Sequence, residues 1–244
     1  MKAAVVTGAA SGIGRALARE LAAEGLRVHL VDVAPTDQLA AELGGQPWRV
    51  DVSNPEQMSR LASAVSDVDL ICLNAGLVGP SLGPPWEPSP GEWSELLSVN
   101  LMGVVNGLRA FVPLLLESGR TSRILITASL AGLLTFPGGG AYAATKHAVV
   151  AVAEQAALAL IGSNISVTLL CPALVRTAMS DVGDDPADVA AAALAASRQG
   201  RFLVAPDEWA TAVRRRTERL LAGEVPDIPA PTQSGEGNKQ TPED

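Results

Sequence analysis

Seven short apolar runs recur along this 244-residue chain, and segments with helical spacing separate them. Most runs are apolar without interruption, which is typical of strands buried on both faces of a parallel sheet. The alternation predicts one α/β domain, in which a doubly wound, mainly parallel, seven-stranded sheet has helices on both faces. The expected strands are residues 2–7, 27–32, 47–51, 69–73, 123–128, 165–170 and 201–205. The expected helices are residues 13–24, 37–43, 55–66, 90–116, 141–161, 186–198 and 207–221.

The predicted domain extends over residues 1–225. Because 48% of the residues are hydrophobic, the chain can build one large core. Residues 79–90 are rich in proline and glycine and predict a surface loop. Residues 226–244 contain almost no apolar side chains, and we expect them to form a disordered tail.

Composition argues against several kinds of partner. The net charge of −8 disfavours nucleic acid, since phosphate binding needs clustered lysine and arginine. Cys72 and Cys171 lie in apolar runs and are expected to be buried thiols, and two histidines are too few for a histidine-based metal centre. No signal peptide is visible and no uninterrupted apolar stretch reaches about 18 residues, so we expect a cytoplasmic protein with no membrane partner.

The first apolar run leads directly into a glycine-rich turn, Thr7-Gly8-Ala9-Ala10-Ser11-Gly12-Ile13-Gly14. Gly8 lets the chain turn out of the strand, Gly12 lets the backbone approach a pyrophosphate, and Gly14 lets the helix pack closely. The free N–H groups at the helix start then face the anion, and we expect Ser11 and Ile13 among the contacts. A strand before and a helix after make this a dinucleotide-binding turn of the Rossmann type.

Asp32 ends the second expected strand, where an acidic residue accepts hydrogen bonds from the ribose hydroxyls of a bound dinucleotide. A carboxylate at this place also repels a 2′-phosphate, so NAD is expected in preference to NADP. The nearest basic residue is Arg15, which could reach a phosphate from the start of the helix.

Four motifs in order resemble the short-chain dehydrogenase/reductase (SDR) family from residue 2 to about residue 180. They are Thr7-Gly-x-x-x-Gly-x-Gly14, Asn74-Ala75-Gly76, Ser129, and Tyr142-x-x-x-Lys146. The resemblance implies hydride transfer between a nicotinamide and an alcohol or ketone, with Ser129, Tyr142 and Lys146 as catalytic residues. It also implies that Lys146 holds the nicotinamide ribose, and that Asn100 marks a helix distortion that holds a water linked to that lysine.

The residues themselves support these roles. Tyr142 and Lys146 are four apart in an expected helix and therefore share one face. A free tyrosine has a pKa of about 10, which a nearby ammonium and an oxidised nicotinamide would lower. Tyr142, the only tyrosine, could then take a proton from an alcohol or return it. Ser129 follows the expected strand 123–128, where its hydroxyl can donate to the substrate oxygen.

Further cofactor contacts are expected at the ends of other strands. Asn74, Ala75 and Gly76 leave room for the adenosine ribose, and Asp51 and Val52 should reach the adenine. The segment from Cys171 to Thr177 resembles the family's Pro-Gly-x-x-x-Thr segment, which touches the nicotinamide amide. Ala173 replaces the usual glycine there. The residues assigned to the nicotinamide by this resemblance are Pro172, Val175 and Thr177.

The expected substrate side is apolar, with small side chains. Leu77, Val78, residues 133–139 and the stretch after Thr177 should line it, and the glycines at 138–140 suggest an open wall. No basic residue other than Arg176 is placed to bind an acidic substrate. We therefore expect a neutral or lipophilic secondary alcohol or ketone.

Two other functions fit the sequence less well. A non-catalytic NAD-binding redox sensor would have no need of the set Ser129, Tyr142 and Lys146. A nucleotide-sugar epimerase or dehydratase would need more chain after Thr177 and a different glycine spacing. The expected assembly is a homodimer through the helices at 90–116 and 141–161, or a homotetramer.

Overall fold

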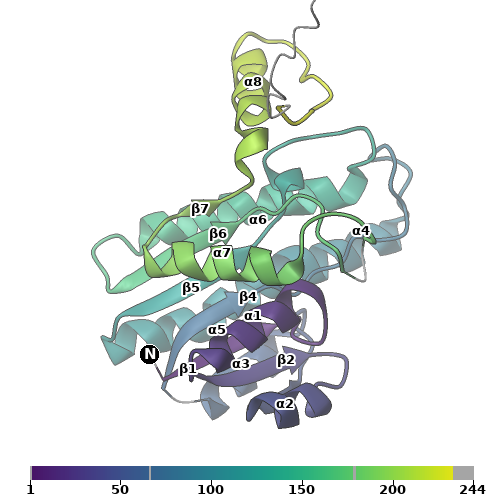
Figure 1. Cartoon of the computed structure of the whole chain (residues 1–244). Coiled ribbons are helices and arrows are strands. Elements are labelled where there is room, and N and C mark those ends of the chain that lie inside the picture. The colour runs from purple at the N-terminus through teal and green to yellow at the C-terminus, as the bar shows by residue number, and fades with distance from the viewer. Residues whose placement is uncertain (1, 66, 178–179, 233–244) are drawn as a thin grey trace, which may run out of the picture.

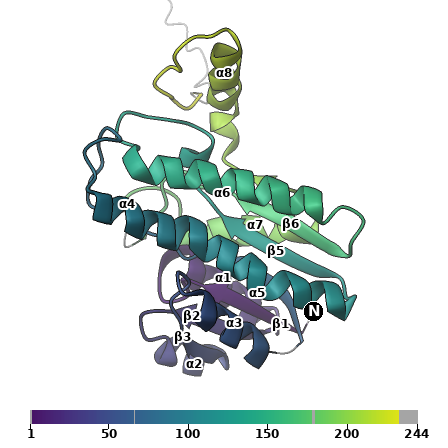
Figure 2. The same ribbon diagram turned by 180° about the vertical axis from the view of Figure 1, so that it is seen from behind.

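The computed structural model describes residues 2–65, 67–177 and 180–232. Within them, seven strands form one sheet in the order β3-β2-β1-β4-β5-β6-β7, and every pairing is parallel (Figures 1 and 2). This confirms the predicted doubly wound α/β fold. The strands are β1 (Ala3–Thr7), β2 (Arg27–Asp32), β3 (Gln46–Arg49), β4 (Val68–Leu73), β5 (Ser122–Thr127), β6 (Ile165–Leu170) and β7 (Leu203–Val204).

Helices cover both faces of the sheet (Figures 1 and 2). On one face lie α1 (Gly12–Ala23), α2 (Asp37–Leu43) and α7 (Pro186–Arg198), and on the other lie α3 (Pro55–Ala64), α5 (Gly103–Ser118) and α6 (Gly140–Ala159). Short elements complete the framework: α4 (Pro90–Leu96), η1 (Leu97–Met102), η2 (Leu130–Gly132) and η3 (Asp207–Trp209). The last helix is α8 (Ala210–Leu221).

Strand β1 shows why continuously apolar runs form the centre of this sheet. Ala3 and Val5 belong to the core under α3, α5 and α6, whereas Ala4 and Val6 belong to the core under α1 and α7. Because successive side chains point to opposite faces, a strand between two helical layers needs an apolar residue at every position. The edge strand β7 pairs only with β6 and is shorter than the expected run 201–205.

The expected helix 90–116 is present as a continuous stretch, Pro90–Ser118, in which η1 is a π-helix. This places a helix distortion at Asn100, as the resemblance implied. By length and composition the stretch is apolar enough to cross a membrane, in contrast to the expectation that no apolar stretch reaches this length. Its polar residues Asn100 and Asn106 are buried against other parts of the fold, so we interpret it as a core helix with one uncovered face.

Helix α8 stands away from the sheet and has no buried residue (Figures 1 and 2). Residues 226–232 return beside it, and Asp227 forms ion pairs with Arg215 and Arg219. Residues 226–232 of the expected disordered tail therefore contact α8. Residues 233–244 lie outside the described residues. The domain boundary at 225 remains a prediction.

Candidate active site

The four expected catalytic residues meet at the carboxyl ends of β4 and β5. Ser129 follows β5, Tyr142 and Lys146 lie in the first turns of α6, and Asn100 lies in η1. A side chain on Gly76, after β4, would begin 3.2 Å from Asn100 Oδ1 and 3.3 Å from Lys146 Nζ. A side chain at this position would therefore crowd both groups, and the turn after β4 lies beside the candidate site.

Tyr142 is held in a largely desolvated position. Burial raises its pKa, and a hydrogen bond with the Ser129 side chain opposes that increase. The expected lowering of the Tyr142 pKa depends on an oxidised nicotinamide as well as on Lys146, and it stays a prediction. The Lys146 ammonium lies 5.7 Å from the centre of the Tyr142 ring, and in the protein alone the cost of burying a phenolate dominates the Tyr142 pKa.

Lys146 is itself buried, with 4% of its surface exposed. Burial lowers its pKa to about 8. Its Nζ donates one long hydrogen bond of 3.4 Å, to the carbonyl of Thr127. A buried ammonium with so few protein acceptors can donate to further oxygens, such as ribose hydroxyls.

The Asn100 side chain is fixed by three hydrogen bonds. Its Oδ1 accepts from the Leu77 N–H at 2.7 Å, and its Nδ2 donates to the Leu77 carbonyl at 2.9 Å and to Thr145 Oγ1 at 3.1 Å. Thr145 Oγ1 in turn donates to the Tyr142 carbonyl at 2.8 Å. Thr145 was not predicted as a site residue, although a polar residue next to Lys146 in an apolar helix is a signal that could have identified it.

The glycine turn has the expected geometry. Gly8 and Gly12 have φ values of 69° and 50°, which favour glycine. A side chain on Gly14 would overlap the Gly8 carbonyl, and one on Gly12 would begin 2.9 Å from Thr177 Cγ2. The turn and Thr177 thus lie together, and Ser11 and Ile13 lie at the start of α1. This narrow turn beside free N–H groups fits the pyrophosphate of a dinucleotide.

The Asp32 carboxylate is fixed beside this turn. Its two oxygens accept hydrogen bonds of 2.9 Å from the Ala10 and Ala34 N–H groups. Each carboxylate oxygen can accept a further bond, so Asp32 is positioned to accept from ribose hydroxyls. Arg15 instead folds back and donates through Nε to the Ala10 carbonyl at 3.0 Å.

The remaining expected cofactor residues also form contacts that fix the chain at the ends of the strands. The Asn74 side chain donates to the Thr7 carbonyl at 3.1 Å, and Ala75 lies against Gly8. The Asp51 carboxylate accepts from the Ser53 N–H and hydroxyl. Asn106, a residue that was not predicted, donates to the Val52 carbonyl at 2.9 Å and fixes the chain after β3.

The segment after β6 lies beside Ser129. The Leu130 N–H donates to the Pro172 carbonyl at 2.8 Å, and Val175 is buried. Ala173 needs no glycine-like conformation, since Asp67 is the one non-glycine residue of the described chain with a positive φ. Arg176, the expected candidate for binding an acidic group, is paired with Asp185 at 3.0 Å.

The expected open wall at 138–140 is wrong at Gly139 and Gly140, whereas Gly138 has only ordinary contacts with Phe136. A side chain on Gly140 would begin 2.9 Å from the Gly83 carbonyl, and one on Gly139 would begin 2.8 Å from the Ala143 side chain. The absence of side chains therefore allows the loop 79–90 and α6 to approach closely. Leu77 is partly exposed near this loop. In the described residues, no three histidine, cysteine or acidic side chains are grouped as metal ligands.

Comparisons with known proteins agree with this geometry. A family model described as short chain dehydrogenase matches residues 2–186. A 1-deoxy-11-beta-hydroxypentalenate dehydrogenase of Streptomyces exfoliatus is 42% identical over 189 residues, which are 73% of this chain and 69% of the relative. An uncharacterised NAD-dependent oxidoreductase of Mycobacterium tuberculosis is 34% identical over 202 residues, with 73% of each chain covered.

A comparison with solved structures also finds a member of the short-chain dehydrogenase/reductase family. A short-chain dehydrogenase/reductase from Burkholderia phymatum, in complex with NAD, superposes with a TM-score of 0.84 at 32% identity. The match covers 94% of this chain and 97% of that one. The similarity therefore extends over the whole sheet and the candidate active site.

Proposed function

The chain belongs to the short-chain dehydrogenase family of oxidoreductases, and on this premise we propose that it transfers a hydride between NAD and a neutral or lipophilic secondary alcohol or ketone. The observation that carries the proposal is the meeting of Ser129, Tyr142, Lys146 and Asn100 at the carboxyl edge of the sheet. In open parallel sheets this edge is where ligands bind. Named dehydrogenases among the relatives support an alcohol group as the site of reaction.

We propose that Tyr142 is the proton donor and acceptor. Its raised pKa keeps the phenol protonated at neutral pH, which suits protonation of the oxygen formed when a ketone is reduced. For alcohol oxidation, Tyr142 must first lose its proton, so this direction is favoured at higher pH. Ser129 contacts Tyr142 and would donate a hydrogen bond to the same substrate oxygen.

Lys146 and Asn100 complete the proposed relay. The Lys146 ammonium would hold the nicotinamide ribose and stabilise the Tyr142 phenolate as it forms. Asn100 fixes the turn at Leu77 and, with it, the space next to Lys146. When bound, NAD would supply the hydride acceptor, and NADH the donor, for the two directions of the reaction.

The preference for NAD rests on Asp32. Its carboxylate is fixed at the glycine turn, where it would accept from ribose hydroxyls and repel a 2′-phosphate. The NAD complex of the solved relative and the NAD-dependent relative support this choice. Contacts from Gly8, Gly12, Asn74, Asp51 and Thr177 would complete the cofactor site.

A second copy of the chain is the proposed protein partner. Met102 at the end of η1 and Leu114 and Leu116 of α5 are between 40% and 50% exposed, and Leu158 of α6 is 60% exposed. Apolar helix faces of this kind favour association. We propose a homodimer or homotetramer in the cytoplasm.

The proposal is tested by measuring NADH formation from NAD with aliphatic, cyclic, terpenoid and steroid secondary alcohols. Turnover of at least one class is expected. If NADH binds but no alcohol in the panel reacts, either a substrate outside these classes or the redox-sensor function replaces the proposed one.

A further inference from the structure

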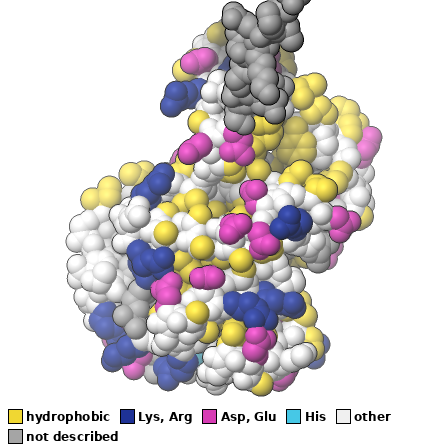
Figure 3. Space-filling model, viewed as in Figure 1, with side chains coloured by type: hydrophobic (Ala, Val, Ile, Leu, Met, Phe, Trp, Pro, Cys, Tyr) yellow, Lys and Arg dark blue, Asp and Glu magenta, His cyan; other side chains and the backbone are white. Residues whose placement is uncertain are grey.

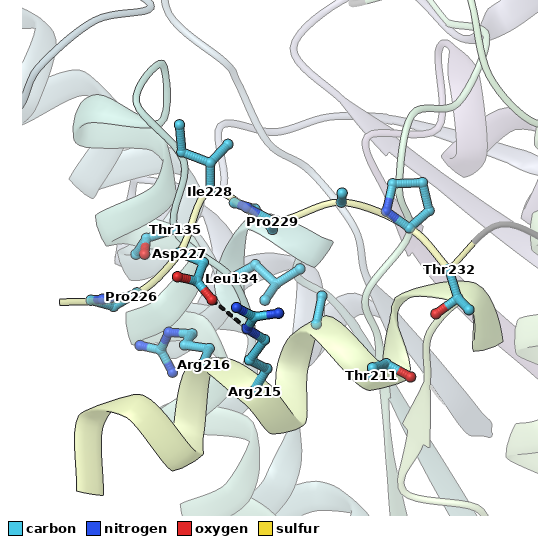
Figure 4. Close-up of a pocket in the computed structure, with 13 residues that line it drawn as sticks. Leu134, Thr135, Thr211, Arg215, Arg216, Pro226, Asp227, Ile228, Pro229 and Thr232 are labelled. Carbon is cyan, nitrogen blue, oxygen red and sulfur yellow. Dashed lines mark ion pairs between the residues drawn. The ribbon is translucent and has the colours of Figure 1, made fainter. Parts of the chain in front are cut away.

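A cavity of about 340 Å³ lies between α8, residues 226–232 and the loop that follows η2 (Figure 4). Leu134 and Thr135 contribute the side formed by the domain, and Arg215 and Arg216 project from α8. Ile228 belongs to the returning segment. The volume is in the range of small-molecule pockets and too small for a folded partner.

The returning segment is fixed to α8, so the cavity is a built feature of the fold. Asp227 forms ion pairs with Arg215 and, at 3.3 Å, with Arg219 Nε. Arg219 also donates to the Val225 carbonyl at 2.7 Å. Further along, the Thr232 N–H donates to the Glu208 carbonyl at 2.8 Å. These contacts hold the segment at both ends.

Arg216 differs from its arginine neighbours. It forms no ion pair or hydrogen bond with any described residue, and its Nε is shielded from solvent. Because the shielded Nε is out of reach of a ligand, a carboxylate in the cavity would pair with the terminal nitrogens of the guanidinium, whose charge has no partner among the described residues. Since Asp227 neutralises one of the two arginines that line the cavity, the lining keeps a positive charge in a chain of net charge −8.

The remainder of the lining is mainly apolar. Leu134, Ala212, Ile228 and three prolines also line the cavity, and Thr135 adds a hydroxyl. In the space-filling view, hydrophobic side chains are also exposed beside the base of α8 (Figure 3). A free inorganic anion would leave these apolar walls without contacts, so the lining favours an anion with a hydrocarbon body.

We propose that this cavity binds a small organic carboxylate with a compact apolar body, and that the carboxylate pairs with Arg216. The proposal concerns a site outside the residues of the relay, and binding there does not depend on the proposed function. An effect of the bound ligand on catalysis, by contrast, rests on the proposed function. Leu134 and Thr135 lie on the stretch that joins Ser129 to Tyr142, so a ligand in the cavity contacts the segment between two catalytic residues.

The test uses the full chain, calorimetry, and adamantanecarboxylate as the probe, with the neutral adamantanemethanol for comparison. The acid should bind and the alcohol should bind at least about tenfold more weakly, since a charge-assisted hydrogen bond contributes about 1.5–3 kcal/mol. Arg216→Gln should weaken binding of the acid about tenfold, and Arg216→Lys less. The matched control is Arg214→Gln, an exposed arginine of the same helix outside the cavity, which should change the affinity less than about twofold.

The proposal is wrong if the acid fails to bind, if the alcohol binds equally well, or if Arg216→Gln and Arg214→Gln behave alike. Thermal melting of each variant checks that the fold is kept. Inhibition kinetics then identify the source of the natural carboxylate. Competition between adamantanecarboxylate and the alcohol substrate would show that the two ligands exclude each other and would favour a substrate that carries a carboxylate in place of the proposed neutral one, and any other pattern indicates a separate effector. Binding without any turnover by the wild type would contradict the proposed function and leave the cavity proposal intact.

Discussion

The side-chain amide of Asn100 donates a hydrogen bond of 3.1 Å to the hydroxyl of Thr145, although the two residues are 45 positions apart. The bond joins the π-helical turn η1 to α6 at the residue before Lys146. Both side chains are buried, with 1% and 0% of their surfaces exposed. Thr145 is therefore positioned to set the distance between Asn100 and Lys146.

Thr145→Val, which keeps the shape and removes the hydroxyl, should lower kcat about tenfold with little change in KM for the alcohol. It leaves one Asn100 N–H without an acceptor, at a cost of about 1–3 kcal/mol in unfolding free energy. Steady-state kinetics and denaturant unfolding measure both effects. Thr168→Val is the matched control, because Thr168 is equally buried but bonds to the Arg201 carbonyl, away from the site. Equal kcat losses in the two variants would count against a positioning role for Thr145.

Gly76→Ala should lower kcat/KM by about tenfold or more. The new methyl group would lie 3.2–3.3 Å from Asn100 Oδ1 and Lys146 Nζ, so one of these groups must move. Gly91→Ala is the control, since its nearest neighbour would be the Ser89 hydroxyl at 3.8 Å. Steady-state kinetics of both variants measure the effect. A Gly76→Ala enzyme with unchanged kcat/KM would show that the close approach of Gly76 to Asn100 and Lys146 is not needed.

Asp32→Ala should raise KM for NAD about tenfold or more and reduce discrimination against NADP. The change removes the acceptor for the ribose hydroxyls and the charge that repels a 2′-phosphate. Asp37→Ala, in the first turn of α2, removes an acid at the same end of the sheet and serves as the control. Fluorescence titration with NADH and NADPH gives the affinities, and tighter binding of NADPH by the wild type would overturn this role of Asp32.

His29 should make the protein sensitive to moderate acid. Burial, with a smaller contribution from Arg27, lowers its pKa from 6.5 to about 4, and its Nδ1 accepts from Trp48 Nε1 at 3.0 Å. Because the folded state disfavours the protonated ring, this contribution to stability is complete above pH 6.5 and is lost as the pH falls towards 4. In His29→Leu, the dependence of unfolding free energy on pH between these values should be flatter. An unchanged slope would assign the acid sensitivity to other groups.

Much of the fold follows from local patterns. The bounds of β2, β6, α2 and α7 agree with the expected ranges, because apolar runs end at strong turn and cap signals such as Asp185 before Pro186. Ser129, Tyr142 and Lys146 were expected as site residues because their spacing follows a family motif, and the fold brings their side chains together. Contacts between distant elements carry no such local signal, which is why Thr145 and Asn106 were not predicted.

Two further features, the pKa of Tyr142 and the cavity beside α8, could not be predicted from the sequence for physical reasons. The pKa of Tyr142 depends on the balance between burial and nearby charge, and the sequence indicated the lysine but not the depth of burial. The cavity beside α8 depends on the return of residues 226–232, whose composition alone suggested a disordered tail.

The most direct test of the proposed function compares wild type and Tyr142→Phe in a single turnover of NAD and the best alcohol of the panel. The variant keeps the ring and its packing and removes only the hydroxyl that exchanges the proton. NADH binding should be unchanged, while the rate of hydride transfer should fall at least about 10²-fold. A Tyr142→Phe enzyme that transfers hydride at the wild-type rate would contradict the role of Tyr142 and the proton relay with it.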